Sequence, residues 1–83
     1  MFKDNLLKNK RILITGGGTG LGKEMASHFA MHGAELYICG RRENVLSKTA
    51  NEISETYNAK VNYQTLDIRA SKDVHDYIEF IFE

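Results

Sequence analysis

A glycine-rich segment at residues 15–22 constrains the fold more than any other part of this chain. It reads Thr-Gly-Gly-Gly-Thr-Gly-Leu-Gly and follows the apolar run Ile12-Leu13-Ile14. An apolar run without alternation is typical of a parallel strand buried on both faces. A glycine-rich turn from such a strand into a helix lets backbone N–H groups and the positive helix end meet an anion. The segment therefore predicts a phosphate-binding turn in an α/β fold.

The rest of the chain alternates helix-like and strand-like segments. Leu21, Met25 and Phe29 recur at helical spacing, flanked by small residues suited to close packing, and Gly33 follows as a C-cap. The later segments are a strand at 36–39, a helix at 43–57, a strand at 61–66, and a helix with N-cap Ser71 and an apolar face of Val74, Ile78, Ile81 and Phe82.

The order β-α-β-α-β-α, with connections too long for hairpins, predicts a parallel sheet in strand order 3-2-1 with right-handed crossovers. This handedness places the first two helices on one face and leaves at most the last helix for the other. The first strand then has no partner on its outer side, although parallel strands are normally covered. We therefore predict a three-layer α/β fold of Rossmann type in which residues 1–83 form the N-terminal part of a single domain, incomplete without a C-terminal half.

Composition argues against several classes of function. Lys+Arg and Asp+Glu both number 11, so the formal net charge is zero and nothing predicts bulk attraction to nucleic acid or to an anionic membrane. The single cysteine, Cys39, cannot form an internal disulfide and lies in an apolar strand, where a buried, inert thiol is expected. No apolar run reaches the length of a signal peptide or a membrane span, so we expect a cytoplasmic protein.

Three glycine patterns can be compared with the segment at 15–22. The dinucleotide fingerprint G-x-G-x-x-G fails in every frame. The phosphate-loop pattern G-x-x-x-x-G-K-[ST] fits from Gly17 to Lys23 but fails at Glu24, where a hydroxyl must hold Mg²⁺. The pattern T-G-x-x-x-G-x-G is met in full by Thr15, Gly16, Gly20 and Gly22. By this motif the chain resembles the short-chain dehydrogenase/reductase family, and the resemblance extends past the glycine segment to cover essentially all 83 residues. A phosphate-loop protein and a turn without a ligand remain as alternatives.

The resemblance implies that the glycine segment holds the pyrophosphate of a dinucleotide. Gly16 permits the sharp turn out of the strand, Gly20 lets the backbone approach the pyrophosphate, and Gly22 lets the helix lie close to the sheet. The cofactor-binding residues implied for this segment are Gly16, Gly17, Gly18, Thr19, Gly20, Leu21 and Gly22.

The end of the second strand indicates which dinucleotide is bound. NAD-binding members of the family commonly carry an acidic residue there, whereas this chain has Gly40 followed by Arg41 and Arg42. A carboxylate would repel a 2′-phosphate, and an arginine can hold one through two parallel hydrogen bonds. We therefore expect NADP (NADPH) rather than NAD. The alternative is an exposed basic pair that caps the strand or starts the next helix.

The third strand ends at Leu66-Asp67-Ile68, which is similar to the family's adenine-binding position. The resemblance implies that the Asp67 carboxylate meets the adenine amino group and that the neighbouring backbone, at Ile68, walls the adenine pocket. Considered without the resemblance, Asp67 would instead satisfy N–H groups of its own turn.

Within the family, the glycine segment and Gly40-Arg41-Arg42-x-x-x-Leu46 look most like the 2,4-dienoyl-CoA reductases. This implies a parent oxidoreductase in fatty acid metabolism that uses NADPH to reduce an enoyl or carbonyl group of an acyl-CoA-like small-molecule substrate, and that acts as a homo-oligomer. The alternative is a non-catalytic nucleotide-binding or interaction module.

The catalytic residues of the family are not found in these 83 residues. The family's catalytic tyrosine is followed four residues later by a lysine, and none of the four tyrosines here has that spacing. We therefore expect the 83-residue chain alone to be inactive. His28 and His32 have the i, i+4 spacing of metal ligands, but no Glu or Cys nearby completes a set, so a solvent-facing pair and no metal are expected.

Overall fold

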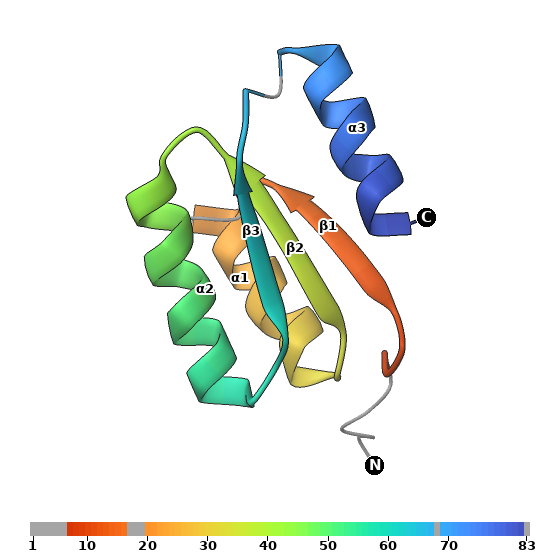
Figure 1. Ribbon diagram of the computed structural model, residues 1–83. Coiled ribbons are helices and arrows are strands. Elements are labelled where there is room, and N and C mark those ends of the chain that lie inside the picture. The colour runs from red at the N-terminus through yellow and green to blue at the C-terminus, as the bar shows by residue number, and fades with distance from the viewer. Residues whose placement is uncertain (1–6, 17–19, 68, 83) are drawn as a thin grey trace.

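Three strands and three helices alternate along the chain (Figure 1). The computed structural model describes residues 7–16, 20–67 and 69–82. The elements are β1 (Arg11–Thr15), α1 (Gly20–Met31), β2 (Glu35–Gly40), α2 (Glu43–Tyr57), β3 (Val61–Thr65) and α3 (Ser71–Phe82). The predicted order of elements is confirmed, and β3 ends one residue earlier than expected. None of the helices in the described ranges is long and apolar enough to cross a membrane.

The three strands form one parallel sheet in the order β1-β2-β3, as predicted. Ile14 of β1 lies opposite Ile38 of β2, which lies opposite Tyr63 of β3. Within the described residues, no strand pairs with the outer edge of β1. The carboxyl ends of all three strands therefore meet at one edge of the sheet, with β1 open on its outer side.

The two faces of the sheet have separate cores because successive strand residues point to opposite sides. Leu36 and Ile38 of β2 belong to the larger core, which α1 and α2 cover. Tyr37 and Cys39, which alternate with them along β2, form the smaller core together with Tyr77 and Ile81 of α3. Figure 1 shows α1 and α2 on one side of the sheet and α3 on the other. This is the arrangement that right-handed crossovers predict.

Helix α1 packs mainly through its alanines. Ala26 and Ala30 are buried, whereas Leu21 is 72% exposed and Met25 is 42% exposed. Of the three large residues at helical spacing, Phe29 packs against the larger core, whereas Leu21 and Met25 do not, because a helix lying close to a sheet needs small residues at the contact. The flank of small residues is the packing side.

Helix α3 also differs from the sequence expectation. Tyr77 and Ile81 are its buried residues, whereas Ile78 and Phe82 are 39% and 51% exposed. The predicted face is therefore wrong at two of its four positions. The N-cap is also shifted, because the Val74 N–H donates to the Ala70 carbonyl at 3.2 Å. This bond places the N-cap at Ala70 and makes Ser71 the first helical residue.

The turn after α1 is a Schellman motif, and Gly33 is the C-cap glycine that the sequence predicted. Gly33 has φ +95°, and its N–H donates to the Ala30 carbonyl. The Ala34 N–H donates to the Phe29 carbonyl at 3.1 Å. These two bonds satisfy carbonyls that the helix end leaves free, and they send the chain directly into β2.

Arg11 ties β1 to the end of α3. Its Nη1 donates a 2.6 Å hydrogen bond to the carbonyl of Ile81, in the last turn of the helix, where a cation is favoured. We expect Arg11→Ala to lower the free energy of unfolding by about 1 kcal/mol, the usual net worth of one hydrogen bond. Urea denaturation of this variant beside Lys10→Ala, a neighbouring exposed cation, measures the effect. Equal losses in the two variants would contradict the assignment.

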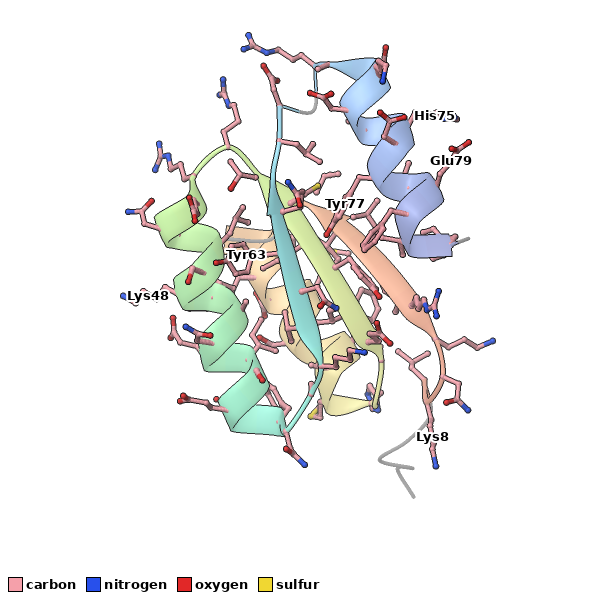
Figure 2. The ribbon with its side chains drawn as sticks, viewed as in Figure 1. Lys8, Lys48, Tyr63, His75, Tyr77 and Glu79 are labelled. Atoms are coloured by element: carbon pink, nitrogen blue, oxygen red, sulfur yellow. The ribbon has the colours of Figure 1, made fainter. Side chains whose placement is uncertain are left out.

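Tyr77 makes the stability of the fold sensitive to alkaline pH. Figure 2 shows its ring pointing from α3 onto the sheet, where it meets Tyr37 edge to face at a centroid distance of 6.4 Å. Burial, reinforced by Cys39 and Tyr37, raises the pKa of Tyr77 from 10.0 to about 12. The folded protein thus holds this proton more tightly than the unfolded chain does. The resulting stabilisation is complete below pH 10 and is lost as the pH rises toward 12.

We therefore expect the free energy of unfolding to fall between pH 10 and 12, and to fall less steeply in Tyr77→Phe. Urea denaturation at a series of pH values measures the slope. Tyr63→Phe, at an exposed tyrosine of β3, is the matched control and should behave like the unmodified chain. An unchanged slope in Tyr77→Phe would show that other groups carry the pH dependence.

Candidate functional site

The sequence-predicted site residues that the structure describes gather at the carboxyl edge of the sheet. The Gly16 N–H donates to the Cys39 carbonyl at 2.8 Å, and the Leu66 N–H donates to the Gly40 carbonyl at 2.8 Å. These two bonds continue the ladders of the sheet past the ends of β1 and β3. Arg41 and Asp67 follow directly. Gly17, Gly18, Thr19 and Ile68 lie outside the described residues.

Two glycines of the turn have backbone conformations that other residues rarely adopt. Gly16 has φ +69° and Gly20 has φ +59°. A Cβ atom built on Gly20 would meet no described atom within 4 Å. The side of Gly20 on which a side chain would stand is therefore open among the described residues at the start of α1. Gly22 is half-buried in the first turn of the helix. Gly20 therefore offers an open approach to backbone at the positive end of a helix, the setting in which phosphate is bound.

The charges around the start of α1 suit an anion but not a phosphate-loop mechanism. The first turn of α1 has no acidic residue. Lys23, the residue that a phosphate loop would direct at the ligand, has its Nζ 3.6 Å from Oε1 of Glu52 on α2. Its ammonium group is thus directed at the neighbouring helix, and this geometry gives no support to the phosphate-loop alternative.

Arg41 and Arg42 lie exposed between β2 and α2. Arg42 is the N-cap residue of α2: its carbonyl accepts the first helical bond, from the Leu46 N–H at 3.0 Å, and its side chain makes no cap bond. The alternative that the basic pair starts the next helix is therefore correct for the backbone of Arg42. The pKa of the Asp67 carboxyl is lowered chiefly by hydrogen bonds from Arg69 and, to a smaller extent, by the positive charge of Arg41.

Asp67 is held by Arg69. The Asp67 Oδ1 accepts hydrogen bonds from the Arg69 backbone N at 2.9 Å and from its Nε at 3.1 Å, and Oδ2 accepts one from Nη2 at 3.0 Å. These bonds, the guanidinium first, hold the pKa of Asp67 below its usual range. Asp67 therefore satisfies an N–H group of its own turn. Sequence reasoning missed Arg69, although a basic residue two positions after a turn aspartate was a readable signal.

Other reactive side chains are placed as structural residues. Cys39 is 1% exposed, and burial raises the pKa of its thiol, as expected of an inert cysteine. His28 is exposed on α1, but His32 lies beyond the last helical residue, Met31, and is half-buried. The expectation of a solvent-facing pair on one helix is therefore wrong. In the described ranges, no group of three or more His, Cys, Asp or Glu residues could hold a metal ion.

Comparison with known proteins places the chain in a family. Residues 10–83 match the family model for short chain dehydrogenases. The chain is 33% identical over 82 residues to the peroxisomal 2,4-dienoyl-CoA reductase of Arabidopsis thaliana, across 99% of this chain and 27% of that protein. It is also 33% identical over 82 residues to the hydroxysteroid 11-beta-dehydrogenase 1-like protein of Danio rerio, across 99% of this chain and 29% of that protein.

Solved structures agree with the sequence comparisons. A short chain dehydrogenase from Escherichia coli CFT073, complexed with NADPH, superposes with a TM-score of 0.84 at 32% identity, across 95% of this chain and 34% of that one. The chain thus spans about a third or less of the length of these three proteins. The family model, in contrast, covers nearly all of the chain. This chain belongs to the short chain dehydrogenase family.

Proposed function

We propose that this chain is the cofactor-binding segment of an NADP-dependent oxidoreductase. The observation that carries the proposal is the convergence of Gly20, Arg41 and Asp67 at the carboxyl edge of one parallel sheet. In open α/β sheets, ligands bind outside the carboxyl ends of the strands. When bound, the nicotinamide cofactor supplies the hydride, and the residues of this chain hold its adenosine and pyrophosphate end.

Each part of the edge has a separate role in the proposal. The glycine segment, from Gly16 through Gly17, Gly18, Thr19, Gly20, Leu21 and Gly22, receives the pyrophosphate. Arg41 and Arg42 hold the 2′-phosphate, and Asp67 with Ile68 lines the adenine pocket. Support for the cofactor class comes from the NADPH complex of the Escherichia coli relative. The choice of NADPH over NADH rests on the two arginines and on the absence of a side chain at Gly40.

We also propose that the parent protein reduces an enoyl or carbonyl group of an acyl-CoA-like substrate. The Arabidopsis relative is named as a 2,4-dienoyl-CoA reductase, while the Danio relative is named for a hydroxysteroid. The two names differ at the same identity to this chain, so this half of the fold carries little substrate information. The motif Gly40-Arg41-Arg42 together with Leu46 favours the first of the two.

Titration with NADPH and with NADH tests the cofactor proposal. We expect NADPH to bind at least about tenfold more tightly, the gain of one or two charge-assisted hydrogen bonds. Equal affinities would remove the role of the arginines, and a preference for NADH would reverse it. For the substrate, consumption of NADPH by the parent protein is followed with a 2,4-dienoyl-CoA and with a 3-oxoacyl-CoA. Turnover of neither contradicts the acyl-CoA proposal and leaves the cofactor proposal standing.

A further inference from the structure

Three hydrogen bonds from one residue fix the Asp67 carboxylate. Arg69 uses its backbone N–H and Nε on Oδ1 and its Nη2 on Oδ2, at 2.9, 3.1 and 3.0 Å. A planar guanidinium that meets both carboxylate oxygens restricts rotation of the carboxylate about its bond to Cβ. The hydrogen bond from the Arg69 backbone N–H closes a turn and also fixes the Asp67 side chain. Asp67 is therefore oriented before any ligand arrives.

The same contacts determine which acceptor positions of the Asp67 carboxylate are left for a ligand. A carboxylate has about four acceptor positions, two on each oxygen. Three are used by Arg69, and among the described contacts the fourth, on Oδ2, is open. The Asp67 side chain is 40% exposed, so this position can be reached from outside the protein. One fixed acceptor matches one N–H donor of an amino group.

Charge supports the same interpretation. Asp67 lies at the carboxyl edge, next to the Leu66 N–H that binds the Gly40 carbonyl, and within electrostatic reach of Arg41. An uncompensated carboxylate there would repel a phosphate-bearing ligand. The Arg69 guanidinium, 3.0 Å from Oδ2, compensates the charge while leaving the acceptor available. The pair is thus suited to a ligand that combines an amino group with phosphates.

We infer that Arg69 is a positioning residue, which orients the Asp67 carboxylate toward the exocyclic amino group of an adenine ring. The inference rests on the proposed function, because the adenine belongs to the bound dinucleotide. Arg69 itself is placed outside the ligand contacts. Its role is to present one Oδ2 acceptor, so its effect should depend on whether the ligand carries the amino donor.

The experiment compares NADPH with its hypoxanthine analogue, which has a carbonyl oxygen where adenine has the amino group. We expect the unmodified chain to bind NADPH about tenfold more tightly than the analogue, the worth of one hydrogen bond to a charged group. In Arg69→Ala this ratio should fall to roughly twofold or less, because the acceptor is no longer held in place. Lys72→Ala removes an exposed cation paired with Asp76 at 2.9 Å and should leave the ratio unchanged.

Arg69→Lys separates position from charge, since it keeps the cation but not the planar fork. We expect its ratio to match that of Arg69→Ala. A full tenfold ratio in either variant would overturn the positioning role, as would equal binding of the two ligands by the unmodified chain. Failure of the proposed function looks different, because the unmodified chain then binds neither ligand, and the inference falls with it. Circular dichroism confirms that each variant is folded, which is expected because the Arg69 side chain is 76% exposed.

Discussion

Gly20→Val should abolish dinucleotide binding, with a loss of affinity of at least about a hundredfold. Gly20 has φ +59°, and a Cβ added there would point into open space at the start of α1. In the proposed function, that space is where the pyrophosphate would lie to receive hydrogen bonds from the N–H groups of the helix end. A branched side chain would fill it. Calorimetric titration with NADPH measures the loss.

Backbone strain must be separated from blocked access in this experiment. Valine at positive φ costs on the order of 1–3 kcal/mol in stability by itself. Gly20→Asn is the sharper variant, because asparagine tolerates this conformation and still occupies the space. Gly33→Ala is the matched control, since Gly33 has φ +95° at the far end of α1. It should lose stability and keep its affinity. Unchanged affinity in Gly20→Asn would refute the pyrophosphate assignment.

Arg41→Ala should lower the affinity for NADPH by roughly tenfold to a hundredfold, which corresponds to the loss of one or two hydrogen bonds between charged groups. The loss for NADH should be no more than about threefold, because NADH lacks the 2′-phosphate. Calorimetric titration with both cofactors gives the two losses directly. Lys48→Ala is the charge-matched control on α2, and Figure 2 shows the Lys48 side chain pointing away from the sheet. Equal losses for both cofactors in Arg41→Ala would make Arg41 a structural residue.

Gly40→Asp provides the complementary test. A Cβ at Gly40 would lie 3.7 Å from Leu46 Cδ2, an ordinary van der Waals contact, so the side chain can be accommodated. The new carboxylate would repel the 2′-phosphate and could accept hydrogen bonds from ribose hydroxyls. We expect this variant to prefer NADH. A retained preference for NADPH would show that the absence of a side chain at this position does not contribute to the choice.

Much of the fold was predictable because its signals are local. The apolar run at β1, the Gly33 cap and the helix at 43–57 follow from residues close together in the chain. The strand order follows from the handedness of parallel crossovers, which is nearly invariant. The packing faces were less predictable. Leu21 and Ile78 have helical periodicity but are exposed, because the small residues of α1 and the ring of Tyr77 make the contacts.

In the candidate site, too, some features could be predicted from the sequence and others could not. The positions of Gly16, Gly20, Arg41 and Asp67 followed from motif spacing, since each lies where a strand ends or a helix begins. The sequence shows a basic residue two positions after Asp67, but spacing alone does not specify the hydrogen bonds that Arg69 makes to the Asp67 carboxylate. The i, i+4 spacing of His28 and His32 did not place them on one helix face, because the helix ends at Met31.

We propose that the cofactor binds at the carboxyl edge of the sheet, and amide chemical shifts in a two-dimensional NMR titration with NADPH locate the binding site. We predict saturable shifts at the carboxyl edge, at Gly16, Gly20, Arg41 and Asp67. Lys8 lies at the opposite end of the molecule, near the N-terminal end of β1, and should not move (Figure 2). Shifts confined to the groove that Lys8 lines with Tyr57 and Lys60 would contradict binding at the carboxyl edge, and so would the absence of any saturable shift.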